Sequence, residues 1–168
     1  MMDLIHNPIN KKTLILGFGN LDREDDGVAW HILDRLAKKY TSQLDVSPEE
    51  VPIHLAPNLD ILFLLQLMPE LAETLAGYDR VCFVDAHTGA VPNELHIVPL
   101  DACFQASPLT HHLTPETLLC LTRDLYHFLP ESLLVSVRGY RFQFNTALSA
   151  RTDHLADQAV DEVCKWIN

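Results

Sequence analysis

The spacing of apolar residues near the start of the chain predicts a strand, a turn and a helix. Residues 13–16 form a short apolar run of β-forming residues that ends at Gly17 and Gly19, which is typical of a buried strand closed by a tight turn. From about residue 26 to residue 39, apolar residues recur every three or four positions, which predicts an amphipathic helix. This helix is expected to pack its apolar stripe on a sheet.

The middle of the chain predicts three further strands and a helix. Residues 51–56 favour a second strand, and Asn58 is suited to cap a helix that carries Ile61, Leu62, Leu65 and Met68 and is interrupted at Pro69. The unbroken apolar run 81–84 suits a strand buried on both faces. Residues 94–100 follow after a short turn, so they predict a strand antiparallel to its neighbour.

The last third of the chain adds two helices around one strand. Thr114, Pro115 and Glu116 are typical of a helix start, and the following stripe is expected to be buried; it consists of Leu118, Leu121, Leu125 and Phe128. Residues 133–137 predict the last strand, and Ser149 is suited to cap the final helix. The pattern therefore predicts a single α/β domain over residues 1–168, with a mostly parallel, twisted five-stranded sheet, one antiparallel strand and helices on both faces.

Composition narrows the classes of partner. The chain has 168 residues and a formal net charge of −11, which argues against nucleic acid or an anionic membrane surface as a partner. Its four cysteines are widely spaced, so they predict reduced thiols and neither a zinc finger nor a disulfide framework. The first residues lack a long apolar core and no stretch is long enough to span a bilayer, so we expect a cytoplasmic protein without a membrane anchor.

The turn after the first strand is acidic. Gly17 and Gly19 imitate the first half of a dinucleotide-binding fingerprint, but Asp22 stands where its third glycine belongs and would repel a pyrophosphate. Nucleotide binding is therefore disfavoured. Glu24, Asp25 and Asp26 follow, and such acids at a helix start often serve only as caps. A turn with this much negative charge is otherwise expected to attract a cation.

A second acid is predicted to meet this turn. Asp85 stands at the carboxyl end of the strand that contains residues 81–84. If that strand is parallel and adjacent to the first, Asp85 and Asp26 emerge at the same edge of the sheet, where open α/β sheets bind ligands. Two carboxylates in one place repel each other unless a cation or a proton lies between them. Capping of a turn by Asp85 alone is the simpler alternative.

Eleven residues carry a resemblance to a known family. The segment from Gly17 to Gly27, GFGNLDREDDG, is similar to the G-x-G-N-x4-D-D-G signature of the hydrogenase maturation endopeptidases, with every signature position filled. Ala29 departs from the second glycine that many members have there. Members also carry an aspartate at the place of Asp85 and a histidine before a helix, for which His111 is preferred over His112. His87, two residues after Asp85, is a further candidate.

The resemblance implies a function and a set of ligands. It implies an endopeptidase that removes the C-terminal extension of the nickel-loaded [NiFe]-hydrogenase large subunit precursor, with Asp26, Asp85 and His111 as the metal-recognising and catalytic residues. Nickel would arrive with the substrate, although oxygen and imidazole ligands also suit zinc or manganese. A nickel-binding accessory protein without proteolytic activity is the alternative. Whether a metal-polarised water or a carboxylate base cleaves the bond, whether Asp25 takes part and which oligomer forms stay open.

Overall fold

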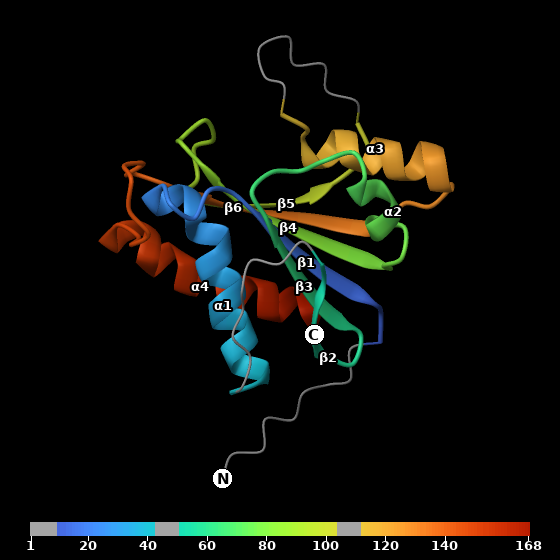
Figure 1. Ribbon diagram of the computed structural model, residues 1–168, viewed down its shortest axis with the longest axis horizontal. Helices are drawn as coiled ribbons and strands as arrows, with labels where there is room; N and C mark the ends of the chain where they lie inside the picture. The colour runs from blue at the N-terminus through green and yellow to red at the C-terminus, as the bar shows by residue number, and fades with distance from the viewer. Residues whose placement is uncertain (1–9, 43–50, 104–111) are drawn as a thin grey trace.

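A twisted six-stranded sheet lies between two layers of helices in the computed structural model, which describes residues 10–42, 51–103 and 112–168 (Figure 1). The strands are β1 (Thr13–Phe18), β2 (Ile53–Ala56), β3 (Leu59–Leu64), β4 (Arg80–His87), β5 (Leu95–Leu100) and β6 (Glu131–Arg138). The α-helices are α1 (Val28–Tyr40), α2 (Leu71–Leu75), α3 (Pro115–Tyr126) and α4 (Ala150–Ile167), and a 3-10 helix, η1 (Glu24–Gly27), leads into α1.

The strand order is β2-β3-β1-β4-β6-β5. The four central strands are parallel, and the edge strands β2 and β5 are antiparallel to their neighbours. The predicted α/β class with helices on both faces is confirmed. The predicted five strands with one antiparallel strand are wrong, because the sheet has six strands and both of its edges are antiparallel.

The sixth strand is β3, where the sequence had predicted a helix beginning at Asn58. Asn58 instead has a φ of 63° and ends a two-residue turn after which Leu59 pairs with Ala56 of β2. Asparagine tolerates this left-handed conformation better than most residues, which favours a hairpin over a helix cap at this place. Residues 61–64 are buried on both faces of the sheet, and such continuous apolar runs do not distinguish a strand from a helix by period alone.

The strand β5 has the predicted direction but lies one strand further along the sheet than a hairpin would place it. It pairs with β6, in antiparallel register from Leu95 opposite Val137 to Leu100 opposite Ser132. The preceding strand β4 pairs with β1 and β6 instead. The short connection after β4 therefore crosses over the end of β6, which arrives later in the chain.

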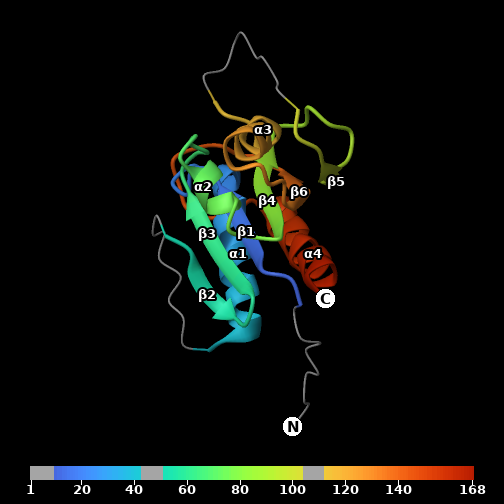
Figure 2. The same cartoon turned by 90° about the vertical axis from the view of Figure 1, so that its right-hand side faces the viewer.

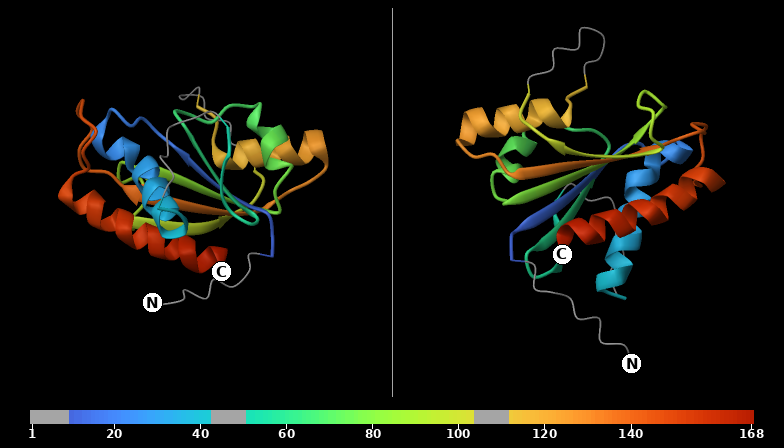
Figure 3. Two further views of the ribbon diagram at one scale, coloured as in Figure 1. Left: turned by 60° about the horizontal axis from the view of Figure 1, so that its bottom comes forward. Right: turned by 180° about the vertical axis from the view of Figure 1, so that it is seen from behind.

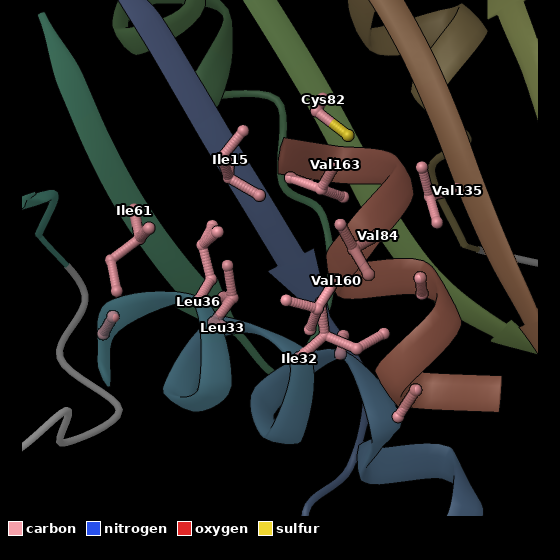
Figure 4. Close-up of a cluster of buried hydrophobic side chains, with 14 of the residues drawn as sticks. Ile15, Ile32, Leu33, Leu36, Ile61, Cys82, Val84, Val135, Val160 and Val163 are labelled. Carbon is pink, nitrogen blue, oxygen red and sulfur yellow. The ribbon is translucent and has the colours of Figure 1, made fainter. Parts of the chain in front are cut away.

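Two apolar layers fill the space between sheet and helices. Alternate residues of the strands point to opposite faces of the sheet, one covered by α1 and α4 and the other by α2 and α3 (Figures 2 and 3). Ile15, Cys82 and Val84 pack on the first face against α1 and α4 (Figure 4), and Leu14, Leu16 and Phe83 belong to the cluster on the second face. All six side chains are fully buried. This alternation fixes the register of the central strands and with it the position of their carboxyl ends.

The helix caps follow the sequence prediction, but one buried stripe does not. Thr114 and Ser149 accept hydrogen bonds from the backbone N–H groups of Thr117 and Thr152, as N-caps do. Leu118 is buried as predicted and Leu121 is partly buried, whereas Leu125, near the end of α3, and Phe128, beyond it, are exposed. Within the described residues, no helix combines the length and the apolar character needed to cross a bilayer.

Candidate functional site

Backbone geometry shapes the turn that follows β1. Gly19 has a φ of +145°, and a Cβ atom on this residue would lie 2.2 Å from the carbonyl oxygen of Asp26. Gly27 is similarly enclosed, since a Cβ atom there would lie 2.8 Å from the Cα of Leu21. The glycines of the signature therefore allow the turn to fold back on η1, which brings the side chain of Asp26 to the end of β1.

Asp26 is partly buried and held by the turn itself. The Asn20 N–H donates a hydrogen bond to Oδ2 of Asp26 at 3.1 Å. The Asn20 side chain in turn accepts a hydrogen bond from the Asp22 N–H at 3.0 Å. The first contact orients the Asp26 carboxylate, and the second holds the Asn20 segment of the turn.

Asp85 lies at the end of β4, the parallel neighbour of β1, as predicted. Its Oδ1 is buried and has no hydrogen-bond partner among the described residues. Burial raises the pKa of the Asp85 carboxyl to about 7; a hydrogen bond from Ser136 on β6 lowers it, and the nearby charges of Glu116 and Asp26 raise it further. A buried carboxylate oxygen without a partner is costly unless something binds it, so this atom is a candidate ligand position.

Asp26 and Asp85 open into one cleft at the carboxyl ends of β1, β3 and β4. The cleft has a volume of about 360 Å³ and is lined by Phe18, Gly19, Asn20, Arg23, Asp26, Leu65, Gln66, Leu67, Asp85, Ala86, His112 and Leu113. The predicted meeting of the two acids is thus observed in the cleft. Carboxylate oxygens of this kind fit a divalent cation, the ligand that the acidic turn had indicated.

Two of the three histidine candidates, His87 and His112, lie among the described residues, and they differ in their position relative to the cleft. His111 lies outside the described residues, while His112 lies on the wall of the cleft. His87 has both ring nitrogens engaged, with Nδ1 accepting from the Gly89 N–H at 3.1 Å and Nε2 at 3.3 Å from the Glu94 carbonyl oxygen, and it does not line the cleft. Among the described residues, no three histidine, cysteine or acidic side chains form a group that could hold a metal ion.

Asp25 takes no part in the cleft. It is fully buried and accepts hydrogen bonds from the backbone N–H groups of Tyr140, Arg141 and Ser149 and from the hydroxyls of Ser149 and Thr152, at 2.7 to 3.0 Å. Burial opposes its ionisation, but the hydrogen bonds from Ser149, Tyr140 and Arg141 outweigh that effect and hold the pKa of Asp25 below its usual value. Asp25 therefore joins η1 to the segment between β6 and α4.

Glu24 reinforces the same junction. Its buried carboxylate pairs with the Arg141 guanidinium at 2.8 Å and accepts a hydrogen bond from the Gln143 N–H at 3.0 Å. The Glu24 N–H donates to the carbonyl oxygen of Asn145 at 2.6 Å. The acids of the turn are Asp22, Glu24, Asp25 and Asp26, and of these the one that lines the cleft is Asp26.

The sequence did not indicate several residues near the cleft. Arg23 and Gln66 line it, and Glu116 lies close enough to Asp85 to raise its pKa. The sequence shows Glu116 only as an acid in the first turn of a helix, because its proximity to Asp85 depends on how α3 packs on the sheet. Arg23 lies within the acidic turn, between Asp22 and Glu24, so the signature segment itself was the only available signal for it.

Fold and cleft together define an α/β domain with a cleft between the carboxyl ends of neighbouring parallel strands, the place where open α/β sheets bind ligands. No protein-family model matches the chain, and no curated protein sequence matches it. Solved structures do. The [NiFe] hydrogenase maturation protease HycI from Thermococcus kodakarensis is similar at a TM-score of 0.62 and 19% identity, with 94% of each chain covered.

Two proteins from Escherichia coli have the same fold. The hydrogenase maturating endopeptidase HybD is similar at a TM-score of 0.64 and 18% identity, over 90% of this chain and 89% of that one. A further endopeptidase reaches a TM-score of 0.67 at 20% identity over the same shares of the two chains. The resemblance to hydrogenase maturation endopeptidases that the signature indicated is thus confirmed at the level of the fold.

Proposed function

We propose that this chain is an endopeptidase that removes the C-terminal extension from the nickel-loaded [NiFe]-hydrogenase large subunit precursor. The observation that carries the proposal is the unpartnered, buried Oδ1 of Asp85, which shares a cleft with Asp26 at the carboxyl edge of the sheet. The fold shared with maturation proteases and the eleven-residue signature support it.

In this proposal the nickel of the precursor is recognised by Asp26, Asp85 and His111. The ion belongs to the substrate, and it brings the peptide to be cut into the cleft. Two carboxylates from separate segments leave coordination positions for ligands already present on the precursor's ion. Zinc or manganese would fit the same donor set and could occupy it in their free form.

Asp26 and Asp85 are also the candidates for proton transfer. They are the acidic side chains among the described residues that line the cleft. A carboxylate oxygen that does not contact the ion can accept a proton from the attacking water and return it to the leaving amine. This role requires the substrate to be docked first, which makes cleavage dependent on nickel in the precursor.

Processing of the precursor tests the proposal directly. Asp26→Asn and Asp85→Asn should each abolish the mass loss of nickel-loaded precursor, because each removes one charged oxygen ligand, while the variants stay folded in thermal melts. Asp161→Asn is the matched control, since this acid is exposed on α4 and should leave cleavage unchanged. Cleavage of nickel-free precursor, or rescue by zinc added to the enzyme alone, would contradict recognition through the substrate's ion.

The same assay separates the two histidines and the alternative function. His111→Gln should abolish processing and His112→Gln should reduce it only mildly; the reverse result would transfer the ligand role to His112, which lines the cleft. Binding of the nickel-loaded precursor by the wild-type protein without any mass change would instead identify a nickel-binding accessory protein of hydrogenase assembly.

A further inference from the structure

A second depression adjoins the acidic cleft on the outer side of the turn after β1. It is open, has a volume of about 470 Å³ and is walled by Leu21, Asp22, Phe63, Leu64 and Leu65 together with Gly19 and Asn20. We call it the apolar hollow. It shares Gly19, Asn20 and Leu65 with the acidic cleft, so the two spaces adjoin at the ends of β1 and β3, and we call the two together the groove.

The two halves of this groove differ in chemistry. The cleft presents Asp26, Asp85 and Arg23, whereas the hollow is lined by leucine and phenylalanine residues apart from Gly19, Asn20 and Asp22. Leu65 stands where the two halves meet and is 66% exposed. Covering such a side chain is favourable by roughly 25 cal/mol for each Å² of apolar surface removed from water.

The hollow is held rigidly relative to the acids. The Gly19 N–H donates to the carbonyl oxygen of Leu64 at 3.1 Å, which joins the turn to the end of β3. The neighbouring Asn20 N–H donates to Asp26, which joins the same turn to the cleft. A ligand that fills the hollow is therefore positioned against the Asp26 carboxylate at little cost in ordering the protein.

An endopeptidase substrate continues on both sides of the bond that is cut, and the hollow adjoins the cleft where one flank of such a substrate would pass. We propose that the apolar hollow binds a large aliphatic or aromatic side chain of the precursor within two residues of the scissile bond. This inference rests on the proposed function and specifies how the substrate is selected. Leu65 is then a specificity-determining residue that contributes to binding and takes no part in proton transfer.

The test compares two exposed leucines in the full-length enzyme acting on nickel-loaded precursor. Leu65→Ser should raise KM about tenfold and change kcat little, since it removes binding that is equal in ground and transition states. Leu125→Ser is the matched control, because Leu125 is 64% exposed on α3 and does not line the groove; it should leave both constants unchanged. Thermal melts establish that both variants are folded.

A second arm replaces apolar residues of the precursor, one at a time, on either side of the scissile bond by serine. The replacement at the position that fills the hollow should raise KM for the wild-type enzyme and have little further effect on the Leu65→Ser variant, because the two changes remove the same contact. Cleavage by both leucine variants with equal KM would overturn the assignment of the hollow and leave the proposed function standing. Absence of cleavage by the wild-type enzyme would overturn both.

Discussion

Asp25 and Asp26 are consecutive residues in one 3-10 helix, yet their side chains face two regions that differ in how far buried carboxylates are hydrogen-bonded. Asp25 faces the segment between β6 and α4, where N–H and hydroxyl donors surround its carboxylate. Asp26 faces the cleft, where one buried oxygen of Asp85 has no hydrogen-bond partner in the part of the chain that the structure describes. A satisfied buried acid stabilises the fold, whereas unsatisfied acids keep binding capacity for a ligand.

The largest effect is expected at the satisfied acid. Asp25→Ala leaves the N–H groups of Tyr140, Arg141 and Ser149 without their carboxylate acceptor, so the free energy of unfolding should fall by about 3 kcal/mol or more. Denaturant titration measures this. Asp26→Ala is the neighbouring control and should change stability by less than about 1 kcal/mol. Equal losses in the two variants would abolish the distinction between the two regions.

A smaller effect of opposite sign is expected at Asp85. Its pKa of about 7 in the folded protein exceeds the value of about 3.9 in an unfolded chain, so the folded state binds more protons between these values. The stabilisation contributed by the protonated Asp85 carboxyl is therefore fully present below about pH 4 and is lost as the pH rises through about 7.

Asp85→Asn cannot ionise and should escape this loss. Above about pH 7, and with chelator present, the variant should be more stable than the wild type by about 2 kcal/mol, a value that allows for the partial exposure of the side chain. The two proteins should converge near pH 4. Parallel stability curves across this range would show that the Asp85 carboxylate is already compensated in the folded state.

The smallest effect is expected at a paired but poorly buried acid. Glu94 accepts hydrogen bonds from Arg151 and Tyr140, and these bring its pKa down to about 2. The stabilisation is thus present above the unfolded pKa and lost as the pH falls towards 2. Glu94→Gln should shift the melting temperature slightly at low salt and not at all at high salt, because water and ions screen such pairs. A large, salt-independent shift would mean that an exposed ion pair stabilises the fold as strongly as the buried contacts of Asp25, which would contradict the proposed ranking.

The signature and the strand pattern predicted the position of Asp26 and its meeting with Asp85, because parallel neighbouring strands end at one edge. They did not predict the hairpin before β3, since its turn depends on the left-handed conformation of Asn58 and its apolar run suits either kind of element. The role of Asp25 was equally hidden. Its partners lie in residues 140–152, and only the tertiary fold brings them to it.

That separation along the chain also sets the order in which the protein can assemble. The first strand and the acidic turn are synthesised early, but the donors that fix Asp25, and the Asn145 carbonyl that receives the Glu24 N–H, belong to the last 30 or so residues. Contacts this distant in sequence close late and slow folding. A nascent or truncated chain would thus carry Asp25 and Asp26 without the contacts that hold η1 in place, so the cleft takes its described shape only once α4 has docked.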